Sequence, residues 1–144
     1  MTLQGRGMKR IASFILIVLL CLTGCSGNVS TASSAATSAN TSGYKQISQE
    51  EAKEMMAKDD GHVIVDVRRQ DEYNAGHIPG AILIPNESID KERPKELPDL
   101  DQIILVYCRS GRRSKEASGK LAKMGYTNIY EFGGINTWPG ETEK

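Results

Sequence analysis

Residues 102–125 have the sequence QIILVYCRSGRRSKEASGKLAKMG, and they carry the clearest structural information in the chain. The first part, Gln102–Tyr107, is a short aliphatic run, which is typical of a strand buried on both faces of a sheet. In the last part, Ser114 is suited to cap a helix through Met124, and Gly125 is suited to end it in the left-handed conformation. A buried strand, a tight loop and a helix in succession indicate an α/β fold.

The segments on either side repeat this alternation of strand and helix. Ser48 and Glu51 form a capping box, so a helix is expected to begin there and to end near Gly61. Weaker helical patterns are expected at residues 70–75 and 88–97. Three further strands are expected at His62–Asp66, Ala81–Ile84 and Asn128–Phe132. The sequence therefore predicts an α/β domain with a central, mainly parallel sheet.

The loop that follows the strongest strand gathers features that stabilise negative charge. Cys108 is expected just past the strand end, where the next helix directs its positive N-terminus. Gly111 permits a tight turn that directs successive backbone N–H groups inward. Three arginines and Lys115 add positive charge at the same place. These features predict a lowered pKa for the Cys108 thiol and a nucleophilic sulfur.

Each of these residues also has a purely structural interpretation. Cys108 could be an inert thiol, but an inert cysteine is expected inside a strand rather than after it. The arginines could be solvated charges, but cations are unfavourable at a helix N-terminus, so at least one is expected to contact an anionic substrate. Arg109 and Arg113 are the better candidates, and Arg112 is expected to point away.

The hexad Cys108–Arg113 resembles the active-site loop of the rhodanese family. Four more motifs fall in the order and spacing of a single rhodanese domain: residues 66–68 (DVR), 72–73 (EY), 76–81 (GHIPGA) and 133–138 (GGINTW). The resemblance covers residues 44–140 and implies the three-layer rhodanese fold, with helices on both faces of the sheet. It also implies transfer of sulfane sulfur from a donor such as thiosulfate to a thiol or cyanide, through a persulfide on Cys108. The implied substrate-binding residues are Arg109, Ser110, Gly111, Arg112, Arg113 and Ser114.

Other polar residues are expected to support this loop rather than to react. Asp66 and Arg68 are expected to form an internal ion pair or to bind loop backbone, and Glu72 is expected to act in the same way. His77 lies in a turn that resembles a scaffold element of the family. Two histidines and one cysteine at these spacings do not form a zinc site, so neither a metal nor an organic cofactor is expected.

Two other functions remain open at this stage. Phosphatases that share the rhodanese fold separate their cysteine and arginine by five residues, whereas Arg113 is already the fifth residue after Cys108. The shorter loop suits a sulfur atom better than a phosphate group. The second alternative is a sulfur-relay or redox module that passes persulfide to a partner protein without turnover.

The first 25 residues predict export. A short basic segment precedes about twelve apolar residues, fewer than the roughly 20 needed to span a bilayer. Either Met1 or Met8 could be the initiator. Leu22-Thr23-Gly24-Cys25 resembles the bacterial lipobox, which implies lipidation of Cys25. Residues 26–43 are rich in Ser, Thr and Ala and are expected to form a flexible tether before the domain at residues 44–144. The expected location is extracytoplasmic, anchored by lipid to the bacterial cell membrane.

The balance of charge argues against a nucleic-acid partner. All eighteen acidic residues lie from Glu50 onward, while Arg6, Lys9 and Arg10 belong to the first ten residues. The remainder of the chain carries fifteen basic and eighteen acidic residues, a net charge of −3. Such a domain has no general attraction for nucleic acid. A monomer is the default expectation, with a small anionic sulfur donor as the substrate.

Overall fold

The computed structural model describes residues 43–144. The predictions for the export segment and for lipidation of Cys25 lie outside these residues, as does the predicted tether at residues 26–43 except for Gly43. Among the described residues, no helix has both the length and the apolar character needed to cross a membrane.

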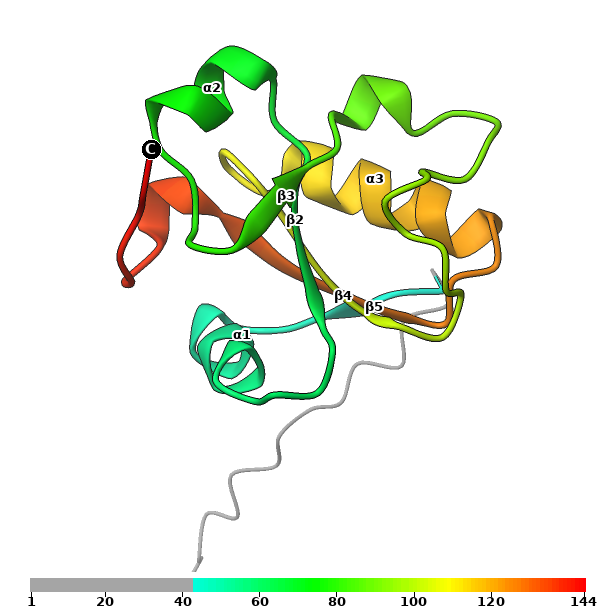
Figure 1. The fold of residues 1–144 in the computed structure, drawn as a ribbon, viewed down its shortest axis with the longest axis horizontal. Helices are drawn as coiled ribbons and strands as arrows, with labels where there is room; N and C mark the ends of the chain where they lie inside the picture. Colours follow the sequence, from blue (N-terminus) through cyan, green and yellow to red (C-terminus); the bar gives the residue numbers. More distant parts are fainter. Residues whose placement is uncertain (1–42) are drawn as a thin grey trace, which may run out of the picture. The chain divides into compact units, whose positions relative to one another are not determined.

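The core of the domain is a five-stranded sheet in which every strand pair is parallel (Figure 1). The strand order is β1-β5-β4-β2-β3, so β4 lies at the centre. The strands are β1 (Lys45–Gln46), β2 (Val63–Asp66), β3 (Ala81–Leu83), β4 (Ile103–Cys108) and β5 (Asn128–Gly134). All four strands predicted from sequence are present, and the short β1 is an addition at the sheet edge.

Helices cover both faces of this sheet, with α1 on one side and α3 on the other (Figure 1). The helices are α1 (Gln49–Met56), α2 (Gln70–Ala75) and α3 (Arg112–Lys123), with 3₁₀ turns η1 (Asn86–Ser88) and η2 (Ile135–Thr137). The predicted architecture, a mainly parallel sheet between helical layers, is confirmed.

Three of the predicted helix features are wrong. The segment 88–97 is not helical beyond the single turn η1, because it contains Pro94, which cannot donate a backbone hydrogen bond. Ser114 does not cap α3, which begins two residues earlier after Gly111. The capping box at Ser48 is present, with both reciprocal hydrogen bonds, but α1 ends at Met56 rather than near Gly61. Gly125 follows α3 at φ +98°, as expected.

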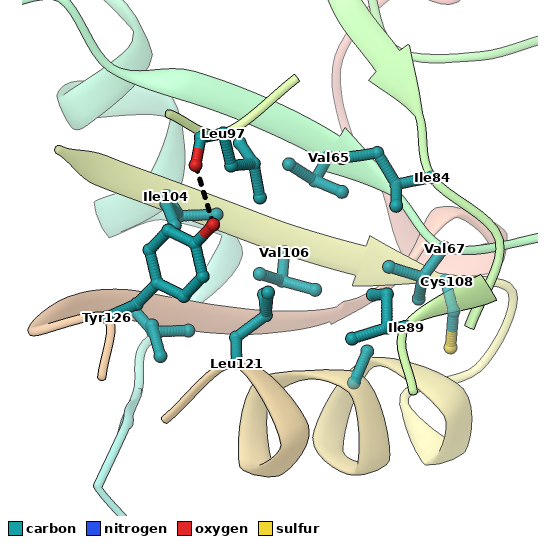
Figure 2. Packing of buried hydrophobic residues seen from close by; sticks show 12 residues of the cluster. Val65, Val67, Ile84, Ile89, Leu97, Ile104, Val106, Cys108, Leu121 and Tyr126 are labelled. Carbon is teal, nitrogen blue, oxygen red and sulfur yellow. Dashed lines mark hydrogen bonds between the residues drawn. The ribbon is translucent and has the colours of Figure 1, made fainter. Parts of the chain in front are cut away.

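The side chains of β4 alternate between two hydrophobic layers. Ile104, Val106 and Cys108 face the layer under α3, where they pack with Val65 and Leu121 (Figure 2). Leu105 and Tyr107 face the layer under α1. Because β4 is buried on both faces, its carboxyl end is fixed in the centre of the domain, where the site lies.

Candidate active site

Cys108 is the last residue of β4 and is almost fully buried, with 1% of its surface exposed. The expectation that it lies past the strand end is therefore wrong by one residue. The sheet register shifts between Val106 and Cys108, so that Cys108 pairs with Gly134 of β5. Figure 2 places Cys108 at the end of the apolar row in the α3 layer. The thiol is thus the point at which the hydrophobic core meets the loop.

The loop after Cys108 surrounds the sulfur with hydrogen-bond donors. Gly111 adopts φ +98°, a left-handed conformation that favours glycine, and its N–H lies 3.1 Å from the Cys108 Sγ. Burial acts to raise the pKa of the thiol. Hydrogen bonds from the Ser114 hydroxyl and from the N–H groups of Ser114, Ser110 and Gly111 outweigh it, so the pKa of Cys108 lies below its ordinary value. Of the predicted nest, the Gly111 N–H is the group that donates a hydrogen bond to the sulfur.

A close approach between β5 and the loop fixes the position of this nest. A Cβ on Gly134 would overlap the carbonyl oxygen of Arg109 and lie 2.6 Å from the Ser110 Cα. The N–H of Asn136 donates to the same Arg109 carbonyl at 3.2 Å. The Gly-Gly motif is therefore required for contact between the strand and the loop, which sequence spacing alone does not reveal.

The arginines of the loop have different environments. Arg113 makes two hydrogen bonds to Glu72, at 2.7 and 2.9 Å, and 16% of its side chain is exposed. This pair holds the pKa of Glu72 at about 2, with a smaller contribution from the Arg69 backbone. Arg109 and Arg112 are exposed, and Arg112 lies 3.8 Å from Glu116. The pairing of Arg113 with Glu72 joins α2 to α3 across the mouth of the loop.

A cavity of about 340 Å³ adjoins the loop and is strongly polar. It is lined by Arg69, Glu72, Glu87, Arg109, Ser110, Arg112 and Arg113. Arg112 thus contributes to this cavity, although the sequence predicts that it points away. Four guanidinium groups against two carboxylates make this the place where a small anion would approach the loop.

The supporting residues predicted from sequence form a network beneath the loop. Arg68 and Asp66 form the expected buried ion pair, with an N–O distance of 2.6 Å. Arg68 also donates to the Gly76 carbonyl at 2.7 Å and lies over the Tyr107 ring. His77 stacks on a tyrosine ring and bonds to backbone, as expected of a turn histidine. These contacts fix the turn beside the site without reaching the sulfur.

Glu131 is a residue of the site that the sequence analysis missed. It lies in β5, is 2% exposed, and its Oε1 accepts hydrogen bonds from the Ser114 hydroxyl at 2.6 Å and the Gly133 N–H at 2.9 Å. The alternation of buried residues along β5 would place residue 131 in the core. A glutamate at a position expected to be buried could have identified this residue, because a buried charge requires polar partners nearby.

Comparison with known proteins agrees with this geometry. The family model of the rhodanese-like domain matches residues 48–141. The thiosulfate sulfurtransferase GlpE of Pseudomonas entomophila is 40% identical over 105 residues, which cover 69% of this chain and 92% of that protein. A Bacillus subtilis protein described as a candidate sulfur carrier, YrkF, is 37% identical over 107 residues, which cover 74% of this chain and 57% of that protein.

A solved structure gives the same result for the fold. The rhodanese with anions from E. coli superposes with a TM-score of 0.54 at 32% identity, over 58% of this chain and 98% of that one. These relatives support the expectation of a rhodanese-type sulfurtransferase. With its parallel sheet, its cysteine at the end of the central strand and a family match over most of its length, this chain belongs to the rhodanese family.

Proposed function

We propose that this protein is a rhodanese-type sulfurtransferase that carries sulfane sulfur as a persulfide on Cys108. The observation that supports this most directly is the hydrogen bond from the Gly111 N–H to the Cys108 Sγ at 3.1 Å, in a loop whose N–H groups and Ser114 hydroxyl lower the pKa of the thiol. Such donors stabilise a thiolate before reaction and would stabilise the terminal sulfur of a persulfide after it. No separate general base is needed if the thiol is already ionised.

The reaction would proceed in two displacement steps on sulfur. In the first, the Cys108 thiolate attacks the outer sulfur of thiosulfate; a new S–S bond forms, the old one breaks, and sulfite leaves with its electron pair. In the second, an acceptor nucleophile such as cyanide or a thiolate attacks the terminal sulfur of the persulfide. The Cys108 thiolate leaves with the electrons of that bond and is ready for the next donor.

The charges at the loop mouth would select an anionic donor. Arg109 and Arg112 are exposed in the cavity and can turn toward a sulfonate group. Arg113 is held by Glu72, so its contribution is a fixed positive charge near the sulfur rather than a mobile ligand. The sulfite leaving group would depart through the same positively charged mouth.

Incubation with thiosulfate followed by mass spectrometry tests this proposal. The peptide that contains Cys108 should gain one sulfur atom, and cyanide should remove that atom and release thiocyanate. Cys108→Ser should gain nothing and should have no turnover. Sulfur transfer that survives in the Cys108→Ser protein would contradict the mechanism.

The similarity to the candidate sulfur carrier YrkF favours one alternative, a relay that delivers persulfide to a partner protein. The chemistry at Cys108 would be the same, and only the acceptor would differ. Steady-state turnover with thiosulfate and cyanide supports the enzyme. A persulfide that forms but passes only to a protein thiol supports the relay.

We further propose that lipid on Cys25 holds the domain outside the cytoplasm, on the basis of the sequence Leu22–Cys25. More than one acyl chain on Cys25 would make the attachment to the membrane stable, because each buried CH₂ group contributes about 0.8 kcal/mol. Wild-type protein should partition into detergent with the membrane fraction, and Cys25→Ser should not. Equal partitioning of the two proteins would contradict lipid anchoring.

A further inference from the structure

Gln49 is a side chain beside the active-site loop that the proposed sulfur transfer does not use. It is the first residue of α1, the helix that follows the short strand β1. Because β1 pairs with β5 and β5 pairs with β4, all in parallel, the carboxyl end of β1 lies at the same edge of the sheet as Cys108. A cavity of about 320 Å³ at this edge is lined by Gln49 and by two residues of the loop, Ser110 and Gly111. The start of α1 is thus a neighbour of the loop.

The Gln49 amide makes two hydrogen bonds to the turn that follows β5. Its Nε2 donates to the Gly134 carbonyl at 2.8 Å and to the Thr137 Oγ1 at 3.0 Å. A carbonyl oxygen only accepts, so the nitrogen of the amide has to face it, and both hydrogens of that nitrogen are used. The Thr137 hydroxyl in turn donates to the Gly134 carbonyl at 3.3 Å. Gln49 therefore ties α1 to the first and the last residue of the segment 134–137.

The same segment contacts the active-site loop. The Asn136 N–H donates to the Arg109 carbonyl at 3.2 Å, and Gly134 pairs with Cys108 in the sheet. A Cβ on Gly134 would overlap the Arg109 carbonyl, so the two backbones are already in contact. A displacement of residues 134–137 would therefore move Arg109, which directly follows the sulfur-bearing residue.

We propose that Gln49 is a positioning residue that acts on the active-site loop through the turn at residues 134–137. Its amide holds this turn where the turn supports the loop, and the loop then keeps the Gly111 N–H within 3.1 Å of the Cys108 Sγ. Gln49 acts only through these neighbours and takes no part in the displacement on sulfur. The inference rests on the proposed role of Cys108 in sulfur transfer.

The pKa of the Cys108 thiol reports how well the loop is held. Burial raises this pKa, and the hydrogen-bond donors of the loop lower it by more. If the turn no longer supports the loop, the Gly111 N–H moves away from the sulfur while the burial remains. The pKa of Cys108 should then rise toward its ordinary value.

Gln49→Met tests the proposal, because methionine has a similar length and no hydrogen-bond donor. The pKa of Cys108 should rise by about half a unit, which is roughly threefold less thiolate at a pH below the midpoint. Thr137→Val removes one of the two acceptors of the amide and should give a smaller rise in the same direction. The measurement is the rate of iodoacetamide alkylation against pH in the full chain, followed by mass spectrometry on the peptide that contains Cys108.

Ser48→Ala is the matched control for a loss of helix stability. Ser48 lies directly before Gln49 and caps α1 by accepting a hydrogen bond from the Glu51 N–H at 3.1 Å. Alanine removes this cap and weakens the same helix, while the amide of Gln49 is unchanged. Ser48→Ala should therefore lower the midpoint of thermal unfolding and leave the alkylation profile of Cys108 equal to that of the wild type.

The outcomes are distinct from those that test the proposed function, because alkylation does not require sulfur transfer. A pKa of Cys108 in Gln49→Met that is equal to or below the wild-type value would overturn the inference. Equal shifts in Gln49→Met and Ser48→Ala would also overturn it, since the effect would then follow from a weaker helix. If Gln49→Met does not fold, Thr137→Val decides in its place by the same two criteria. Failure of thiosulfate to load Cys108, with the predicted alkylation profiles intact, would contradict only the proposed function.

Discussion

At the scale of single residues, the proposed reactivity of Cys108 depends on how its buried sulfur is surrounded by hydrogen-bond donors. Burial alone would raise the pKa of Cys108, and the hydrogen bonds from Ser114, Ser110 and Gly111 reverse that effect. The arginines, on which the sequence interpretation relied, act less directly, because Arg113 is already ion-paired with Glu72 and Arg109 and Arg112 are exposed. The backbone of the loop is thus more important to the thiolate than the neighbouring side-chain charges.

The Glu72–Arg113 pair predicts a specific dependence of stability on pH. The pKa of Glu72 is about 2 in the folded protein against 4.5 ordinarily, so its contribution is fully present above about pH 4.5 and is lost as the pH falls toward 2. Glu72→Gln should remove this dependence and lower the free energy of unfolding at pH 7 by roughly 1–3 kcal/mol. Urea unfolding at a series of pH values measures both.

The exposed Glu54 provides a matched control for this prediction. Glu54→Gln should leave both the stability at pH 7 and its acid dependence close to those of the wild type. If Glu72→Gln loses stability in acid with the same slope as the wild type, the pair does not contribute as described.

At the scale of secondary-structure elements, β4, β5 and α3 together set the loop geometry. Gly134 in β5 lies against the loop so closely that a Cβ would overlap the Arg109 carbonyl. Gly134→Ala should therefore displace the loop, lower stability by at least about 2 kcal/mol and return the pKa of Cys108 toward that of a free thiol. Thermal unfolding and the pH profile of alkylation measure these effects.

Replacement of Gly119, in the middle of α3, by alanine is expected to have the opposite effect on stability. A Cβ there would meet no atom within 4 Å, and alanine is the better helix former. Gly119→Ala should raise the free energy of unfolding by roughly 0.5–1 kcal/mol and leave the thiol unchanged. Destabilisation by Gly119→Ala would show that the face of α3 at this position is more tightly packed than described.

The elements that sequence predicted correctly are those with local determinants. The capping box at Ser48, the aliphatic run of β4 and the glycine after α3 each depend on neighbours in the chain. The predicted start of α3 was wrong because serine is a favoured helix N-cap residue, whereas the hydroxyl of Ser114 donates to Glu131, seventeen residues away. Such long-range contacts, like that between Glu72 and Arg113, leave no periodic pattern in the sequence.

At the scale of the whole molecule, the sheet order explains why the site needs residues from the entire domain. The central strand β4 supplies Cys108, its neighbours β2 and β5 supply Asp66 and Glu131, and α2 supplies Glu72. The expected motifs are spread along the chain, yet the parallel sheet brings the carboxyl ends of its strands to one edge. The loop therefore depends on the complete fold rather than on its own hexad.

The C-terminal segment closes the domain and offers a test at this scale. Glu143 exchanges two backbone hydrogen bonds of 2.8 Å with His77, and its side chain accepts a hydrogen bond from the Gly80 N–H. Figure 1 shows the C-terminus close to α2. Deletion of residues 141–144 should lower the free energy of unfolding by roughly 1–3 kcal/mol, since each bond contributes about 1 kcal/mol. Glu143→Gln keeps the backbone bonds and should cost much less; equal losses in the two proteins would contradict this account.

The pKa of the Cys108 thiol tests the central claim most directly. Thiolate absorbance in the ultraviolet, recorded against pH in the wild type and corrected with Cys108→Ser, measures it without any assumption about the donor. Because the loop directs hydrogen-bond donors at the sulfur, the midpoint of the thiol titration should lie clearly below the value of about 8.5 for free cysteine. A midpoint at or above that value would show that burial outweighs the loop hydrogen bonds, and the proposed nucleophile would be lost.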